Sequence, residues 1–143
     1  MVVALEDSSK VFLDPGAELR FAEHFTSHKR EVYLNGEAFF EVTENPNRPF
    51  FVNAGQITTK VLGTSFRVKA PRSGSEVEVS VKTGKVSVYE SEKEAPIQSS
   101  KNGSGVILSP NHQVTFFRKD KLFCAVILQK QKINRQKTNN FNI

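Results

Sequence analysis

The chain has 143 residues, 38% of them hydrophobic and 24% charged, which suits one globular domain with a packed core. Twelve phenylalanines, the absence of tryptophan and abundant valine favour strands over helices. The formal net charge is +5, but the part from Arg118 to the C-terminus carries +6, so residues 1–117 carry −1. A nearly neutral main body argues against a nucleic-acid-binding domain, which carries its basic patch on the folded surface.

The N-terminal part alternates apolar and polar residues with a period of two, which is the pattern of a half-buried strand. Residues 10–13 predict a strand that ends at the Pro-Gly turn sequence at 14–16. Residues 18–28 show no helical periodicity beyond a single predicted turn. No signal peptide precedes these elements, which leaves either a cytosolic protein or a fragment of an exported one, and the start of the chain favours the fragment.

The dipeptide Asn35-Gly36 is a strong tight-turn signal between two strand-like runs. It predicts a hairpin that joins a strand at 31–34 to a partner strand at 37–43. In the second strand the even-numbered residues are apolar and share one face.

Two prolines between residues 45 and 49 break the chain, because closely spaced prolines cannot lie inside a central strand. Strands are predicted again at 50–52 and, after a turn at Gly55, at 57–62. An isolated glycine, Gly63, then interrupts the alternation. Such a glycine predicts a bulge or a bend where the sheet folds over its own core.

The clearest local pattern lies at residues 77–88. Valines alternate with charged or polar residues at 77–81 and again at 86–88, and Thr83-Gly84 separates the two runs. This pattern predicts a second hairpin.

The C-terminal part begins with a polar stretch at 91–105, which predicts a long mobile loop. Residues 106–108 and 113–117 then predict another unit of strand, turn and strand. Residues 122–128 predict one more strand or a short buried element, and their apolar side chains favour an interior position for the single cysteine, Cys124.

About ten short strands separated by turn signals predict an all-β fold, either a two-layer sandwich or a solenoid-like β-fold of mostly antiparallel strands. Residues 1–128 are assigned to one β-domain. Residues 129–143 are basic and polar, so we expect a disordered or loosely docked tail, or a remnant of a further C-terminal lobe. No run approaches the roughly twenty apolar residues of a membrane-spanning helix.

No arrangement of residues in the sequence predicts catalysis, a metal site or a cofactor. His24 and His28 have the spacing of a helical metal pair, but their neighbours form helices poorly and further ligands are missing, so two surface histidines are the favoured interpretation. Glu37 and Glu41 lie on one face of a strand about 13 Å apart, which exceeds the spacing of a glycosidase carboxylate pair. The chain is accordingly predicted not to be an enzyme.

Three consecutive blocks of the sequence resemble the signature of the FecR family. They are Gly36-Glu37-Ala38-Phe39-Phe40-Glu41-Val42, Arg48-Pro49-Phe50-Phe51-Val52 and Lys60-Val61-Leu62-Gly63-Thr64-Ser65-Phe66-Arg67-Val68. The run at 79–86 is similar to the hairpin that follows in the family, and residues 5–13 are similar to its opening strand, although Ser8 stands where a turn glycine is usual. The resemblance covers approximately residues 2–117.

The resemblance implies the periplasmic part of a single-pass inner-membrane anti-sigma regulator. In this family a cytoplasmic N-terminal part binds an extracytoplasmic-function sigma factor. The periplasmic part senses the N-terminal signalling domain of an outer-membrane TonB-dependent transducer. The chain is similar to the periplasmic β-lobe alone, without the sigma-binding segment, the membrane helix and most of the C-terminal lobe. Neither a cofactor nor nucleic acid is implied.

The family-motif residues are expected to be mainly structural, because strand alternation and turn geometry already account for them. They are Gly36, Glu37, Phe39, Phe40, Val42, Pro49, Phe50, Val61, Leu62, Gly63, Thr64, Phe66 and Val68. The core candidates among them are Phe40, Phe50, Val61, Leu62, Phe66 and Val68. Tyr33, Phe39 and Phe51 fall on the opposite phase, so they predict a partner-binding patch or an edge for strand addition if that face is exposed, and more core if it is covered.

Two other functions stay open. A carbohydrate- or envelope-binding β-domain predicts an exposed aromatic platform, and the absence of tryptophan and the presence of only two tyrosines count against it. An enzyme predicts a polar pocket that contains carboxylates or histidines with perturbed pKa values.

Overall fold

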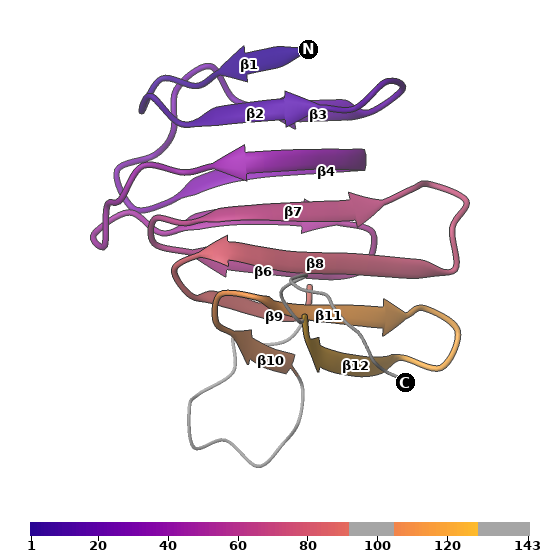
Figure 1. The fold of residues 1–143 in the computed structure, drawn as a ribbon. Helices are drawn as coiled ribbons and strands as arrows, with labels where there is room; N and C mark the ends of the chain where they lie inside the picture. The colour runs from indigo at the N-terminus through magenta and orange to yellow at the C-terminus, as the bar shows by residue number, and fades with distance from the viewer. Residues whose placement is uncertain (92–104, 129–143) are drawn as a thin grey trace, which may run out of the picture.

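The computed structural model describes residues 1–91 and 105–128, and in these residues it contains strands and no helix. Within these residues, twelve strands follow one another (Figure 1). Their bounds are β1 (Val2–Ala4), β2 (Lys10–Leu13), β3 (Glu18–Phe21), β4 (Arg30–Glu41), β5 (Phe50–Ala54), β6 (Ile57–Val61), β7 (Ser65–Ala70), β8 (Glu76–Thr83), β9 (Val86–Glu90), β10 (Gly105–Leu108), β11 (His112–Phe117) and β12 (Leu122–Ile127). Most of the predicted loop at 91–105 and the whole predicted tail at 129–143 lie outside the described residues.

The strands form two layers that share one strand, β4 (Figure 1). Sheet A contains β1, β2, the second half of β4, β7, β8, β11 and β12. Sheet B contains β3, the first half of β4, β5, β6, β9 and β10. Neighbouring strands pair antiparallel except β4 and β5, which run parallel. The predicted all-β fold of mostly antiparallel strands is confirmed, and its strands are arranged in two layers.

Strand β4 changes layers at Gly36. Residues 30–34 pair with β5 in sheet B, whereas residues 36–41 pair with β7 in sheet A. Gly36 has a φ angle of 111°, and a Cβ atom there would lie 2.8 Å from the Cβ atom of Ala17, so the bend requires glycine. The predicted hairpin at Asn35-Gly36 is wrong: the chain reverses there, but its two arms lie in different layers and do not pair.

The predicted hairpin at 77–88 is also wrong. Strand β8 pairs with β7 and β11 in sheet A, whereas β9 pairs with β6 and β10 in sheet B. The predicted unit at 106–117 is likewise divided between β10 in sheet B and β11 in sheet A. A tight turn reverses the chain in the same way whether the next strand pairs with the previous one or faces it across the core, so local sequence does not distinguish the two arrangements.

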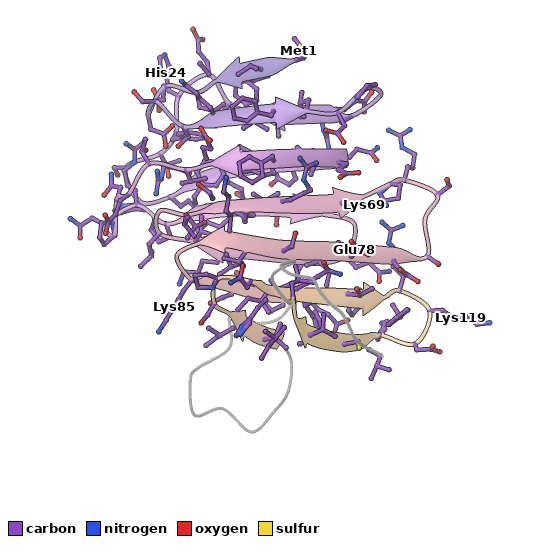
Figure 2. All side chains as sticks on the ribbon, viewed as in Figure 1. Met1, His24, Lys69, Glu78, Lys85 and Lys119 are labelled. Carbon is purple, nitrogen blue, oxygen red and sulfur yellow. The ribbon has the colours of Figure 1, made fainter. Side chains whose placement is uncertain are left out.

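The two ends of the sandwich differ in their connections (Figure 1). At one end, here called the crossover end, β6 passes to β7, β8 to β9 and β10 to β11 from one sheet to the other. At the opposite end, the hairpin end, β5 returns to β6, β7 to β8 and β11 to β12 within a sheet. The connection from β2 to β3 and the bend of β4 at Gly36 also cross between the sheets at this end. Figure 2 shows Lys85 at the crossover end and Lys119 at the hairpin end. Gly63 lies between β6 and β7 at the crossover end, which confirms the predicted bend over the core.

Inward-facing apolar side chains fill the space between the two sheets. Phe40 stacks on Phe66 with ring centroids 5.0 Å apart, and Phe50 meets Phe40 edge-on at 6.4 Å. Five core candidates are buried, namely Phe40, Phe50, Val61, Phe66 and Val68. The prediction for Leu62 is wrong, since its side chain is 44% exposed. Val61 takes the inward phase, and the chain leaves sheet B directly after it.

Two further predictions are wrong. The predicted helical turn at 18–28 is strand β3 followed by an irregular segment. Cys124 is exposed instead of buried. It lies on β12 at the edge of sheet A, where Phe123 is the residue that packs against the core.

Candidate functional site

The family-motif residues lie mainly at bends, at ion pairs and in the core. A Cβ atom at Gly63 would overlap the backbone of Glu44, so the crossing from β6 to β7 requires glycine. The carboxylate of Glu37 lies 2.9 Å from the guanidinium of Arg67 on the outer face of sheet A. These positions support the expectation that the motif is mainly structural.

A buried arginine, Arg30, ties together four segments at the crossover end. Its side chain is fully buried. Nη1 donates hydrogen bonds to Oδ2 of Asp7 at 2.7 Å and to the carbonyl of Thr43 at 2.9 Å. Nε donates to the carbonyl of Arg48 at 2.7 Å, and Nη2 donates to that of Leu62 at 3.2 Å. We call this cluster of Arg30, Asp7 and Thr43 the Arg30 knot.

The carboxylate of Asp7 completes the Arg30 knot. It accepts hydrogen bonds from the backbone N–H of Ser9 at 3.0 Å and from the Ser9 hydroxyl at 2.8 Å. Burial by itself raises the pKa of Asp7, but the hydrogen bonds from Arg30 and Ser9 outweigh it and lower that pKa below its ordinary value. Since the charged groups of the knot satisfy one another inside the fold, the knot is structural and offers no site to a ligand.

Sequence reasoning missed the Arg30 knot, although one signal for Arg30 was present. Arg30 lies on the same phase of β4 as Val32 and Leu34, which are both buried. Extending the period-two pattern one step toward the N-terminus would have placed Arg30 inside. Its partners lie in distant segments and had no comparable signal.

The structure separates the three predicted partner-binding residues. Tyr33 and Phe51 lie on the outer face of sheet B, in neighbouring strands β4 and β5. Phe39 lies in the second half of β4, on the outer face of sheet A. Because the two outer faces point away from each other, the three side chains do not form one patch or one aromatic platform.

Phe39 is already occupied by neighbours on sheet A. Its ring centroid lies 6.2 Å from that of Phe12, and the cationic groups of Arg67 and Lys82 lie 5.7 Å and 5.9 Å from it. The side chain is half-buried beneath them. This arrangement stabilises the face and leaves little aromatic surface for a partner.

Phe51 on sheet B is similarly flanked. The ammonium groups of Lys29 and Lys60 each lie 5.9 Å from its ring centroid, and Lys29 also forms an ion pair of 3.3 Å with Glu31. Phe51 is half-buried and flanked by two lysines, so little of its ring is open to a partner.

Tyr33 is the most open of the three aromatic residues, with 45% of its surface exposed. The guanidinium of Arg20, on the neighbouring strand β3, lies 5.6 Å from its ring centroid. Within the described part of the chain, Arg20 has no acidic partner. The pair therefore presents an exposed ring and an unneutralised cation side by side.

An open groove of about 690 Å³ adjoins Tyr33 and extends to the hairpin end. We call it the Tyr33 groove. Its lining residues are Glu18, Arg20, Tyr33, Leu34, Asn35, Asn53, Gly55, Ala70, Arg72, Ser91 and Arg118.

The arginines of the Tyr33 groove differ in how their charge is used. Arg118 donates to the carbonyls of Gly74 at 2.6 Å and Pro71 at 3.0 Å, so it holds the β7–β8 loop. Arg72 forms an exposed ion pair of 3.2 Å with Glu18, a type of pair that contributes little. Arg20 is left to bind an incoming group. The groove therefore suits a carboxylate-bearing partner that also contacts an aromatic ring.

The described residues contain no group of three or more histidine, cysteine, aspartate or glutamate side chains arranged to hold a metal ion. His24 lies at the crossover end, where its Nδ1 is 3.2 Å from Oε1 of Glu6 (Figure 2). None of the secondary structure in these residues is a helix capable of spanning a membrane.

Comparisons with known proteins agree on one family. The family model described as FecR protein matches residues 1–87. Two crystal structures, at 1.65 Å and 2.50 Å, of a "putative anti-sigma factor from Parabacteroides distasonis ATCC 8503" resemble the chain. Each has 35% sequence identity and a TM-score of 0.78. Among curated proteins no match was found. The resemblance covers 92% of the chain but only 57% of each solved chain, so the present sequence spans little more than half the length of these relatives.

Proposed function

Since the chain belongs to the FecR protein family, we propose that it is the signal-sensing interaction module of a transmembrane anti-sigma regulator. In this proposal the module lies in the periplasm, as part of a single-pass inner-membrane protein. It relays the state of an outer-membrane TonB-dependent transducer to an extracytoplasmic-function sigma factor, which a cytoplasmic segment of the longer protein binds. The module acts by binding the N-terminal signalling domain of the transducer and catalyses no reaction.

The Tyr33 groove is the observation that carries this proposal. Tyrosine and arginine are enriched among the residues that dominate the energy of protein interfaces. Tyr33 and Arg20 stand together on sheet B, and the groove beside them has room for a protruding acidic side chain. On sheet A, by contrast, Phe39 lies beneath two cations, one of which is itself paired with Glu37.

Calorimetric titration with the signalling domain of the TonB-dependent transducer proposed as the partner tests the proposal. The wild-type chain is expected to bind with a dissociation constant in the micromolar range or below. Replacing Tyr33 or Arg20 by alanine is expected to weaken binding about tenfold or more, because each side chain is a candidate hot spot.

Phe39→Ala is the matched control, since it removes an aromatic side chain from the same strand on the opposite face. Its dissociation constant is expected to stay within about twofold of the wild type, as for a residue outside the interface. If Phe39→Ala weakens binding as much as Tyr33→Ala, the Tyr33 groove is not the binding site. If the folded wild-type chain produces no heat with the signalling domain, the relay function proposed for this module is contradicted.

A further inference from the structure

Arg72 and Glu18 line the Tyr33 groove from two different elements. Arg72 belongs to the loop between β7 and β8, residues 71–75, and Glu18 is the first residue of β3. Their side chains meet at 3.2 Å and are 76% and 67% exposed. Among the described residues, neither side chain forms another ion pair or hydrogen bond. An exposed pair of this kind contributes little to stability, so a competing carboxylate can displace it.

The backbone of the β7–β8 loop is fixed, although the side chain of Arg72 is exposed. The guanidinium of Arg118 donates hydrogen bonds to three carbonyls of the loop, at distances from 2.6 Å to 3.3 Å, namely those of Pro71, Arg72 and Gly74. The backbone N–H of Gly74 also donates to the carbonyl of Pro71 at 3.1 Å. Arg72 can therefore exchange Glu18 for another carboxylate without a rearrangement of the loop.

The positions of Glu18 and Arg20 define a spacing along the groove. They are two residues apart on β3, so their side chains share the outer face of sheet B about 7 Å apart. Arg72 reaches the position of Glu18, and Arg20 lies one side-chain position further along the same face. Two acidic side chains of an extended chain have the same spacing when one residue separates them, because one face of a strand repeats every two residues.

The groove has a surplus of positive charge. Its lining contains Arg20, Arg72 and Arg118 against Glu18, and an adjoining hollow of about 610 Å³ shares Glu18 and Arg72 with it. The other charged residues of sheet B and of this hollow, counted with their ion-pair partners, are equally divided between acids and bases, namely Asp7, Asp14, Glu31, Glu37 and Glu90 against Lys29, Arg30, Lys60, Arg67 and Lys69. The surplus therefore belongs to the groove, and it favours a partner that contributes carboxylates.

From these observations we propose that the Tyr33 groove recognises two carboxylates separated by one residue in an extended segment of the partner. One carboxylate meets Arg20, and the other takes the place of Glu18 on Arg72. Glu18 is then an internal competitor that occupies Arg72 in the free protein and makes the site selective for a correctly spaced pair. The inference rests on the proposed function in taking the groove as a partner-binding surface, but it does not depend on which protein binds there.

Two short peptides of identical composition test the spacing. Both are rich in threonine, have blocked ends and contain two glutamates, which one residue separates in the probe and which are adjacent in the control. Adjacent side chains of an extended chain point to opposite faces, so the control presents only one carboxylate to the groove. Fluorescence polarisation is expected to show about fivefold tighter binding of the probe, which is the effect of one exposed charge pair.

Variants of the ion pair test the competition. Glu18→Gln removes the competing charge with little change in shape and is expected to tighten binding of the probe about two- to fivefold. Arg72→Ala is expected to weaken binding by a similar factor and to remove most of the preference for the probe. In the double variant, the gain from Glu18→Gln is expected to be largely lost, because the two residues act through one contact.

The matched control for Glu18→Gln is Glu41→Gln. Glu41 is likewise an exposed acid, but it lies opposite Lys10 in sheet A, at the end of β4 that is remote from the groove. Its replacement is expected to change the affinity for the probe by less than about 1.5-fold, because solvent and salt screen distant surface charges. Circular dichroism verifies that each variant is folded.

Three outcomes would overturn the inference, namely equal affinity for the two peptides, no binding of either, and an undiminished gain from Glu18→Gln when Arg72 is absent. Calorimetry with the signalling domain separates such a failure from a failure of the proposed function. A chain that binds the signalling domain but does not distinguish the peptides contradicts the inference alone. A chain that prefers the probe but produces no heat with the signalling domain supports the inference and contradicts the transducer as the partner.

Discussion

The guanidinium groups of Arg30 and Arg20 have different surroundings and different roles. In the Arg30 knot, donors of the guanidinium are bound inside the fold, to one carboxylate and three carbonyls. Beside the Tyr33 groove, Arg20 stacks on an exposed ring and meets no acid within the described residues. Where the fold uses an arginine's donors, the residue is architectural; where it leaves them unused on a surface, they are available to a partner. The following predictions test this contrast, beginning with the largest expected effect.

Asp7→Ala is expected to lower the free energy of unfolding by about 3–5 kcal/mol, because it leaves the charge of Arg30 buried and unpaired. Urea unfolding measures the loss. The matched control is Glu37→Ala, which removes the nearer of the two carboxylate partners of the half-exposed Arg67 and is expected to cost less than about 1 kcal/mol. Replacing Arg30 by Met and Asp7 by Leu together is expected to recover part of the loss. Equal losses for Asp7→Ala and Glu37→Ala would remove the distinction between knot and surface.

Arg20→Ala is expected to act in the opposite way. Its free energy of unfolding should change by less than about 0.5 kcal/mol, since the side chain is exposed and is not part of the core. Binding of the transducer's signalling domain should weaken about tenfold and should become less sensitive to salt, because one charge pair is lost. Thermal unfolding and calorimetry at two salt concentrations separate the two effects. A destabilised Arg20→Ala variant would show that this arginine is architectural as well.

The lowered pKa of Asp7 predicts a specific loss of stability in acid. The unfolded chain takes up a proton at this carboxyl near its ordinary pKa of 3.8, whereas the folded chain holds the carboxylate charged to lower pH. The stabilisation from Asp7 is therefore complete above the unfolded pKa and is lost as the pH falls through the folded pKa. Urea unfolding across this range is expected to show a shallower pH dependence for Asp7→Asn than for the wild type. Parallel curves would mean that the knot does not perturb this pKa.

Ser8→Gly is expected to give the smallest effect, a rise of about 0.5 kcal/mol in the free energy of unfolding. Ser8 has a φ angle of 73° in the turn that presents Asp7 to Arg30, and this left-handed conformation costs a non-glycine residue roughly 1–2 kcal/mol. Glycine avoids this strain, but part of the gain is lost because glycine gives up more backbone entropy on folding. The family resemblance places a glycine at this position. A rise in the thermal midpoint would agree with this, and a fall would show that the Ser8 side chain stabilises the turn.

The strand pattern along the chain could be predicted from the sequence, but the pairing of strands into sheets could not. Period-two alternation identified buried side chains such as Phe40, Phe66 and Val68, because alternation depends only on neighbours along the chain. The turn signal at Asn35-Gly36 also located a reversal of the chain, but it did not show to which sheet the next strand belongs. That choice depends on contacts between distant segments.

The same limit applies to the candidate site. Tyr33 and Phe39 fall on the same phase of the period-two alternation. Because β4 bends at Gly36 and passes from one sheet to the other, however, Tyr33 lies on the outer face of sheet B and Phe39 on the outer face of sheet A. The Arg30 knot needed the positions of Asp7, Thr43 and Leu62, which come together only in the folded chain.

The sharing of β4 between the two sheets has a mechanical consequence. The first half of β4 is hydrogen-bonded into sheet B and the second half into sheet A, so the sheets cannot slide past each other unless one half of this strand gives up its ladder. We therefore expect the two sheets to resist sliding past each other and to move as one body. A load applied at Tyr33 on sheet B would reach sheet A, whose edge strand is β12, through β4 as well as through the connections at the crossover end.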